Sequence, residues 1–395
     1  MKKMNKVGLF CLAAVLTASV CLFAAQTVSV NADSGNADYE LLARNFLASQ
    51  YNLKELEYEN ISAHTSVDLF DETENVVGKA VILDRDGELD YVVINLITGQ
   101  VDEFGFNEEA TVEKFLADER IYYGGALNFS TKSGNEYQDF NGRKISQTKF
   151  ETRTREFKNS ARKVKNRSSS PNGGIISWTD IVNRNAGNTN SEWNYLSGIN
   201  WNGVTGTGLS FYSQEYFNEY YNYTYSTYID GTCGPTATTN MFVYYKWLGF
   251  SNALKNNSAY DTFARMVTLS NWNNGTYFND DKNSLKGFAN ERGYNYDMDT
   301  YFWGTNWDAF KGSINKGRPV LTETKSTGYG HEVVVVGYEQ FTYTYQVQVL
   351  WWWETRTTNY RYLRVIDGFA SSNSSRFVDY NGFYSTINGC DFMLK

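Results

Sequence analysis

The chain has 395 residues, of which 42% are apolar and 20% charged, and this length exceeds what one hydrophobic core normally organises. We therefore expect two globular parts, rather than wholesale disorder or a fibre. The net charge of −8 provides no general attraction for phosphate, which argues against a nucleic-acid partner. The 30 Tyr, 25 Phe and 10 Trp residues favour a β-rich protein with wide, flat side chains.

Residues 1–32 have the features of an export signal. Lysines precede an uncharged run over 7–25, and Val30-Asn31-Ala32 follows the small-residue pattern of a cleavage site. The run is long for a signal, so an uncleaved membrane anchor is the alternative. We expect a secreted, extracellular protein, and the alternative is an exported protein that stays associated with the cell surface.

Residues 33–152 contain no tryptophan and predict a small α+β domain. The predicted elements are a helix over 39–51 and strands over 76–83, 91–97 and 101–106, with turns at 84–87 and 98–99. The acidic residues of the first turn lack the distal Glu of a calcium loop, so we interpret them as part of a hairpin. His64 has no chemical partner nearby in the sequence and is expected to be exposed.

A cationic segment separates this region from the rest of the chain. Residues 153–167 hold seven Lys and Arg residues against one Glu, and they run into a Ser-, Pro- and Gly-rich stretch. Such a composition does not bury enough surface to order itself. We predict a linker over 153–175 that is accessible to proteases, and the alternative is a long solvated loop inside one domain.

Residues 176–395 are long enough for an enzyme domain, and their central feature is Cys233. Pro235 suits the first turn of a helix that carries apolar residues on one face and ends at Gly249. Cys233 would therefore lie at a helix N-terminus, where the thiolate form is stabilised. For a lone cysteine the alternative is a small buried hydrophobic residue.

His331 is the one histidine of this region, and it opens a run of four valines. A continuous valine run is typical of a central strand covered on both faces. Asp367 ends a later alternating strand, although Asp-Gly is also a strong turn signal. Because a Cys–His pair needs a third group to fix the imidazole, Asp367 is our candidate for that role.

Three segments together resemble the catalytic segments of bacterial secreted papain-like cysteine peptidases, the C39-like group. They are GTCGPTA at 231–237, GHEVVVVGY at 330–338 and IDGF at 366–369, in the Cys, His, Asp order of that group. The resemblance covers about residues 178–395 and implies a papain-like fold, with a helical lobe against an antiparallel β lobe. It implies peptide-bond hydrolysis through Cys233, His331 and Asp367, and a preceding propeptide that acts as an intramolecular inhibitor.

The chain departs from the group just before the cysteine. Relatives have a glutamine there whose side chain donates to the oxyanion, but no glutamine lies between residues 215 and 232. Gln214 and Asn222 are the remaining candidates, and neither fits the usual spacing. Such a donor is typically worth several kcal/mol to the transition state, so either it is displaced or catalysis is weakened.

We expect no cofactor and no metal, because one histidine and two cysteines after the signal's own cysteines provide too few nitrogen and sulfur ligands. The expected partner is a protein or peptide substrate. One alternative is an enzyme that cleaves peptidoglycan peptides, with Trp and Tyr stacking on sugars. Another is a decayed, non-enzymatic surface binder. A disulfide between Cys233 and Cys390 would exclude both enzymes, but Cys390 is more simply a buried residue of the last strand.

Overall fold

A computed structural model describes residues 36–395 apart from 54–60, 118–119, 135, 141, 143, 169–186, 230, 274, 302–306, 327–328, 350, 370–375 and 381–387. The export signal predicted over 1–32 lies outside the described residues. Among the helices that are described, none is long and apolar enough to cross a membrane.

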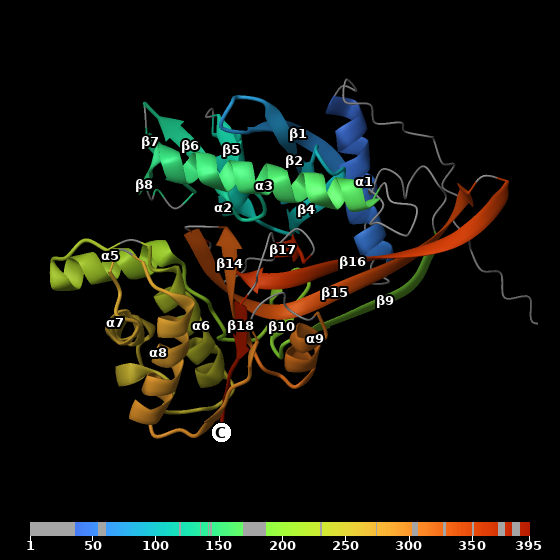
Figure 1. Cartoon of the computed structure of the whole chain (residues 1–395). Helices are drawn as coiled ribbons and strands as arrows, with labels where there is room; N and C mark the ends of the chain where they lie inside the picture. Colours follow the sequence, from blue (N-terminus) through green and yellow to red (C-terminus); the bar gives the residue numbers. More distant parts are fainter. Residues whose placement is uncertain are drawn as a thin grey trace, which may run out of the picture.

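The N-terminal region, residues 36–168, is a strand meander flanked by helices (Figure 1). Its helices are α1 (Asn36–Leu53), α2 (Glu109–Leu116) and α3 (Gln147–Ser168). Its strands are β1 (Ile61–Phe70), β2 (Val76–Arg85), β3 (Glu88–Asn95), β4 (Gln100–Gly105), β5 (Ile121–Tyr123), β6 (Phe129–Ser133), β7 (Glu136–Asp139) and β8 (Lys144–Ile145). The predicted helix and the three predicted strands are confirmed as α1 and β2 to β4.

The acidic turn between β2 and β3 is a tight hairpin turn. Arg85 pairs with Glu88, and the two residues between them, Asp86 and Gly87, have φ of 55° and 89°. Positive φ at both central residues is the backbone of a two-residue turn that matches the twist of the strands. The hairpin interpretation is therefore confirmed, and His64 on β1 is exposed as predicted.

The composition predicts a linker from residue 153, but α3 continues through to Ser168. The cations do not prevent the helix because one of its faces is apolar and buried, through Phe150, Phe157 and Ala161. Lys158 also forms ion pairs with two acidic side chains that follow β1, Asp71 and Glu72. The first half of the expected linker is thus part of the packed N-terminal region, and 169–175 lie outside the described residues.

The C-terminal region combines a group of helices with long strands. Its helices are α5 (Gln214–Tyr225), α6 (Cys233–Trp247), a 3-10 turn (Lys255–Asn257), α7 (Ala259–Leu269), α8 (Phe278–Glu291) and α9 (Trp307–Asn315). Its strands are β9 (Gly187–Tyr195), β10 (Ile199–Asn200), β11 (Gly203–Val204), β12 (Tyr296–Asp297), β13 (Thr300–Tyr301), β14 (Val320–Ser326), β15 (Tyr329–Val349), β16 (Trp352–Ile366), β17 (Arg376–Asp379), β18 (Asn388–Asp391) and β19 (Met393–Leu394).

Helices α5 to α8 gather on one side of the strands, and α6 packs directly on β15 (Figure 1). Strand β15 lies between β14 and β16, and its four valines are buried, as the sequence predicts for a central strand. The α+β class is confirmed.

The two regions share one sheet and one aromatic cluster of the core. Strand β17 pairs with β16 on one side and with β4 of the N-terminal region on the other, so the described strands run continuously from β13 to β8. Aromatic side chains from both regions pack in a single cluster across this junction, including Phe46, Phe104, Tyr362 and Phe377. The junction brings the N-terminal region against the strand ends that carry the predicted site residues.

Candidate active site

Cys233 is the first residue of α6 and is buried. The preceding residue, Thr232, does not cap the helix; its hydroxyl donates instead to Asn218 Oδ1 at 2.7 Å. The first N–H groups of a helix point out of its N-terminal end, and the Cys233 N–H is one of these. The helix start therefore provides both the dipole that favours a thiolate and a backbone donor for an oxyanion.

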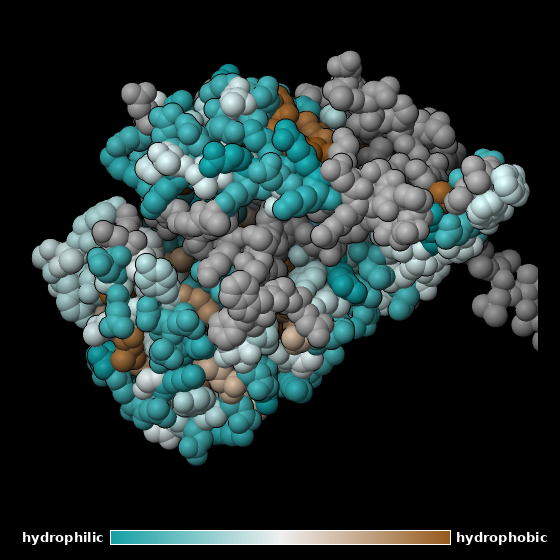
Figure 2. Space-filling view, in the orientation of Figure 1, coloured by the Kyte–Doolittle hydropathy of each residue, from teal (hydrophilic) through white to brown (hydrophobic). Residues whose placement is uncertain are grey.

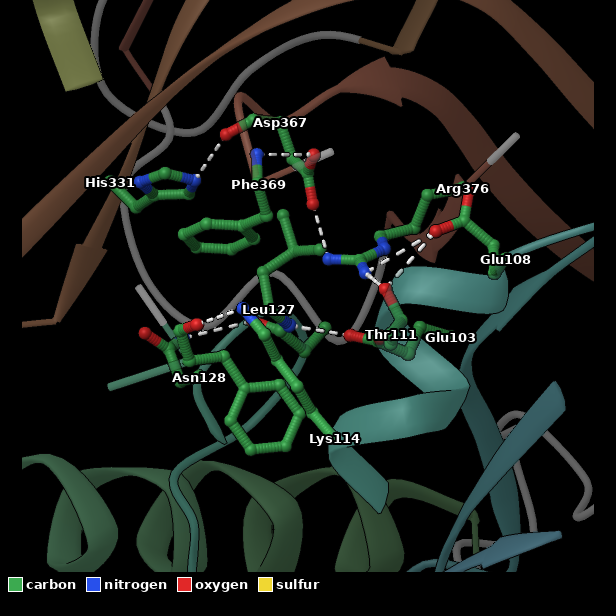
Figure 3. Close-up of polar contacts among 12 residues, drawn as sticks. Glu103, Glu108, Thr111, Lys114, Leu127, Asn128, His331, Asp367, Phe369 and Arg376 are labelled. Carbon is green, nitrogen blue, oxygen red and sulfur yellow. Dashed lines mark hydrogen bonds and ion pairs between the residues drawn. The ribbon is translucent and has the colours of Figure 1, made fainter. Parts of the chain in front are cut away.

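His331 lies near the start of β15, and one ring nitrogen is fixed by the backbone. Its Nε2 is 2.9 Å from the main-chain oxygen of Asp367. A carbonyl oxygen only accepts, so Nε2 carries the proton in the neutral ring and Nδ1 is left as the basic nitrogen. The ring of Phe369 stacks on the imidazole with centroids 4.5 Å apart and planes 2° apart, which buries the ring (Figure 3).

The carboxylate of Asp367 does not contact the imidazole, in contrast to the predicted orienting role. Its Oδ1 accepts the Phe369 N–H at 3.0 Å, and its Oδ2 accepts from Arg376 (Figure 3). The reason is that β17 brings the buried Arg376 guanidinium to the end of β16, where it is the stronger partner for a buried carboxylate. Asp367 therefore holds the ring through its main-chain oxygen, while its side chain fixes the turn that carries this oxygen.

Arg376 also reaches into the N-terminal region. Its Nη2 donates to Thr111 Oγ1 and lies 3.5 Å from Glu108 Oε2, at the start of α2. All these groups are buried, so the guanidinium joins the turn beside the imidazole to the N-terminal region (Figure 3). Burial raises the pKa of Asp367, and the neighbouring Arg376 opposes that rise.

The segment around Cys233 lies beside the His331–Asp367 segment. A side chain at Gly368, which has φ of 74°, would place its Cβ 3.3 Å from Cγ2 of Thr236, one turn after Cys233. Glu332, the residue after His331, lies close enough to Cys233 for a thiolate there to raise the pKa of the Glu332 carboxyl, which burial already raises. Helix α6 thus presents its first turn to the ends of β15 and β16.

Gln214 lies at this same junction although it is far from Cys233 in the sequence. Its main-chain N–H donates to the Gly368 oxygen at 2.8 Å, and its Nε2 would be 3.8 Å from a Cβ at Gly368. Asn240 of α6 fixes the preceding segment, because its amide both accepts from and donates to the backbone of Tyr212. Helix α5 takes up most of the residues between Gln214 and Cys233. Gln214 can therefore lie near the site although 19 positions separate it from Cys233 in the sequence.

Asn222 has a different role. Its Oδ1 accepts the Ile229 N–H at 2.9 Å, which closes the loop after α5. The side-chain amide of Gln214, by contrast, has no hydrogen-bond partner among the described residues and lines a cavity of about 150 Å³. Gln214 and Gly231 line this cavity from the C-terminal region, and Asp139 and Gly142 line it from the N-terminal region.

A pair of buried carboxyls lies behind the nucleophile. Asp281, in the first turn of α8, approaches Gly234 so closely that a Cβ there would be 2.1 Å from Asp281 Oδ2. Glu332 lies close enough to Asp281 for a charge on Asp281 to raise the pKa of the Glu332 carboxyl, and both side-chain oxygens of Asp281 are buried without a hydrogen-bond partner among the described residues. Burial raises the pKa of Asp281 to about 7, and burial together with Asp281 raises the pKa of Glu332 well above its usual value. No Lys, Arg or His among the described residues forms an ion pair with either carboxyl.

The two cysteines that the structure describes, Cys233 and Cys390, are both free thiols. Cys390 is fully buried in β18, as predicted, and burial raises the pKa of its thiol far above the ordinary range. In the described part of the chain, His, Cys, Asp and Glu side chains form no group of three or more that would hold a metal ion.

Residues 208–361 match the model of the Peptidase_C39 like family. The C-terminal region is therefore similar to this family over these residues. The predicted resemblance is thereby confirmed, and it supports a cysteine-type peptidase in general. The match contains Cys233 and His331 and ends before Asp367; it covers less than half of the chain and none of the N-terminal region. Comparisons with curated proteins and with solved structures gave no match.

Four residues of the C39-like region and its surroundings escaped the sequence reasoning: Arg376, Phe369 in its stacking role, Asp281 and Glu332. Arg376 follows a Ser- and Asn-rich stretch, where an isolated cation looks like an ordinary surface residue. Glu332 had a usable signal, because an acidic residue at the head of a buried valine run requires a partner in the core.

Proposed function

We propose that this chain is a cysteine peptidase, made as an exported precursor, that hydrolyses peptide bonds with Cys233 and His331. The observation that carries the proposal is the contact of 2.9 Å between His331 Nε2 and the main-chain oxygen of Asp367. With Nε2–H donating to the Asp367 oxygen, Nδ1 is the base, and α6 presents Cys233 beside the same segment. The C39-like match over both residues supports the same reading.

In the proposed reaction His331 Nδ1 accepts the proton of Cys233, and the thiolate attacks the carbonyl carbon of the peptide bond. The carbonyl electrons move to oxygen, where the Cys233 N–H and the Gln214 amide stabilise the negative charge. His331 then returns its proton to the leaving amine as the C–N bond breaks. Water, deprotonated by the same nitrogen, hydrolyses the thioester and restores the thiol.

Asp367 acts in this mechanism as a positioning residue. Its main-chain oxygen keeps the imidazole in the Nε2–H tautomer, and its carboxylate is held by Arg376 and the Phe369 N–H. Gln214 is the proposed second oxyanion donor, because its backbone is tied to Gly368 and its side-chain amide lines the cavity next to the nucleophile segment.

The N-terminal region is the proposed intramolecular inhibitor. Asp139 and Gly142 close one side of the cavity that Gln214 lines. The 124–128 loop places Leu127 against Phe369 and Arg376, with Leu127 held at φ of 62° while its N–H donates to the buried Glu103 (Figure 3). A non-glycine residue in this conformation is costly and is kept where the surroundings require it. Release of residues 36–168 would open the cavity from this side.

The proposal is tested first by thiol chemistry. Iodoacetamide at neutral pH should label Cys233 much faster than Cys390, and pre-treatment should abolish hydrolysis of casein. Cys233→Ser and His331→Ala should each lower kcat by at least about 10³-fold without unfolding the protein. Equal labelling of both thiols with no hydrolysis of casein, after proteolytic removal of the N-terminal region, would instead identify a non-enzymatic binder. Hydrolysis of purified cell wall but not casein would identify a peptidoglycan peptide as the substrate.

A further inference from the structure

The hairpin of β15 and β16 extends well past the rest of the sheet. Strand β9 pairs with β15 only as far as Thr344, and β17 pairs with β16 only over Tyr362 to Val365. Beyond these points, among the described residues, the two strands pair only with each other, to Val349 and Trp352. Tyr345 and Val347 still pack in the cluster that includes Phe46 of α1, and the end of the hairpin beyond them projects at one edge of the molecule (Figures 1 and 2). We call residues 346–349 and 351–356 of this hairpin the ribbon tip.

Three consecutive tryptophans occupy the ribbon tip. Trp351, Trp352 and Trp353 have 82%, 45% and 66% of their surface exposed. Trp352 and Trp353 are neighbours in β16, so their side chains leave opposite faces of the ribbon. The rings of Trp351 and Trp352 lie 5.3 Å apart at 76°, which makes an edge-to-face cluster and not a flat platform. The tip is therefore a wedge that is aromatic on both sides.

The ribbon tip has almost no net charge. From Phe341 to Trp353 the sequence contains no charged residue. The first charges after the tryptophans, Glu354 and Arg356, form an ion pair of 2.9 Å with each other. One facing pair across the strands here is uncharged and polar, with Gln346 Nε2 donating to Thr355 Oγ1 at 2.7 Å.

An exposed cluster of large aromatic side chains is costly in water and marks an interaction site. Tryptophan is the residue most suited to the boundary between lipid and water, because its ring is apolar and its N–H remains hydrogen-bonded. We propose that the ribbon tip inserts into the headgroup layer of a lipid bilayer that carries no net charge. The inference does not depend on the proposed peptidase chemistry.

Charge and shape separate this partner from others. Anionic lipid is attracted by unpaired Lys and Arg, but the tip offers one Arg that is already paired, on a chain of net charge −8. A sugar chain stacks on the faces of rings arranged side by side, whereas Trp351 and Trp352 are nearly perpendicular. A protein partner would cover one face of the ribbon, and the tryptophans project from both.

The experiment compares the full chain with W351S/W352S/W353S, using vesicles of pure phosphatidylcholine and of phosphatidylcholine mixed with phosphatidylglycerol. Trp193→Ser is the matched control, because Trp193 is partly exposed on β9, away from the tip. Emission is read with acyl chains brominated near the headgroup, so that only inserted tryptophans are quenched. The wild type and the triple variant both keep the apolar N-terminal segment, so the difference between the spectra of these two proteins reports the tip alone.

We expect the wild type and Trp193→Ser to bind neutral vesicles with quenched, blue-shifted emission that is the same in 0.1 and 0.5 M salt. The triple variant should lose this signal, and its partition coefficient should fall by at least about tenfold. Its melting temperature and its thiol labelling should be unchanged. Absence of quenching in the wild type overturns the proposal. So does binding that requires the anionic lipid and disappears in high salt, or binding of purified cell-wall glycan that depends on the same tryptophans.

Discussion

The two sides of the candidate site bury carboxyl groups in opposite ways. On the imidazole side, Asp367 is paired with the buried Arg376. On the nucleophile side, Asp281 and Glu332 face each other and have no ion-pair partner among the described residues. A buried carboxylate stays charged only beside a compensating cation, and otherwise it keeps its proton. One side thus carries a charged ion pair, and the other carries two acids whose pKa values burial raises.

Each pair supports a different catalytic segment. Arg376 fixes the turn whose main-chain oxygen holds His331. Asp281 packs against the backbone that follows Cys233, where only glycine leaves enough room. The nucleophile side therefore avoids a full negative charge close to the thiolate, which two ionised carboxylates would destabilise. The imidazole side tolerates a carboxylate because Arg376 neutralises it.

The largest expected effect comes from removing the cation. Arg376→Met leaves Asp367 and Glu108 buried without a partner, and we expect a loss of about 3–5 kcal/mol in the free energy of unfolding, measured with denaturant. Arg265→Met is the matched control, because Arg265 and Glu291 form a half-exposed pair that is worth less than about 1 kcal/mol. Equal losses in the two variants would contradict the view that Arg376 balances the imidazole side.

Gln214 connects the two sides, through Gly368 on one and the Tyr212–Asn240 contact on the other. If its amide stabilises the oxyanion, Gln214→Ala should lower kcat by about 10²–10³-fold and change KM little. Asn222→Ala, in which a loop contact is lost, should reduce stability and leave kcat within a few-fold. A normal kcat in Gln214→Ala would show that a residue other than Gln214 is the second donor to the oxyanion.

The pH dependence of stability tests the nucleophile side. With a pKa near 7 in the folded protein against 3.8 as the ordinary value, Asp281 keeps its proton between about pH 4 and 7 only when folded. The folded state then binds more protons, so this group's contribution is fully present below about pH 4 and is lost as the pH rises to 7.

We therefore expect Asp281→Asn to remove a fall on the order of 2–4 kcal/mol in the free energy of unfolding across that range. Asp280→Asn makes the same change one residue earlier and should keep most of the slope. The other charged groups that act on the pair are Asp280, Cys233 and Glu323, all acidic, and they steepen the fall rather than reverse it. A wild-type stability that rises from pH 4 to 7 would show that the pair is ionised.

The sequence was sufficient for features that depend on local pattern. The hairpin at Asp86-Gly87, the helix that begins at Cys233 and the buried valine strand after His331 each follow from residue spacing and turn chemistry. Helix α3 was missed because charged residues dominate its composition. Its buried Phe150 and Phe157 lie on a different face of the helix from the charges.

Contacts between distant segments were not accessible in the same way. Whether the Asp367 side chain or its main-chain oxygen meets the imidazole depends on Arg376, and Arg376 is placed by the pairing of β17 with β4, over 250 residues earlier in the chain. Gln214 was ranked low because α5 separates it from Cys233 in the sequence while the backbone bonds at Tyr212 and Gly368 return it to the site. Spacing rules fail where a helix and the loop after it return the chain to the place from which the helix started.

The smallest expected effect concerns the contact between the two sides. Gly368 has φ of 74°, and Gly317 has φ of 73° on an open surface with nothing near its missing Cβ. Alanine at either position is strained by about 1–2 kcal/mol, so both variants should lose similar stability. Only Gly368→Ala also pushes a methyl group to within 3.3 Å of Thr236 and 3.7 Å of Gln214. It should therefore lower kcat several-fold while Gly317→Ala does not, and equal kcat values in the two variants would show that the sides of the site need not be in close contact for catalysis.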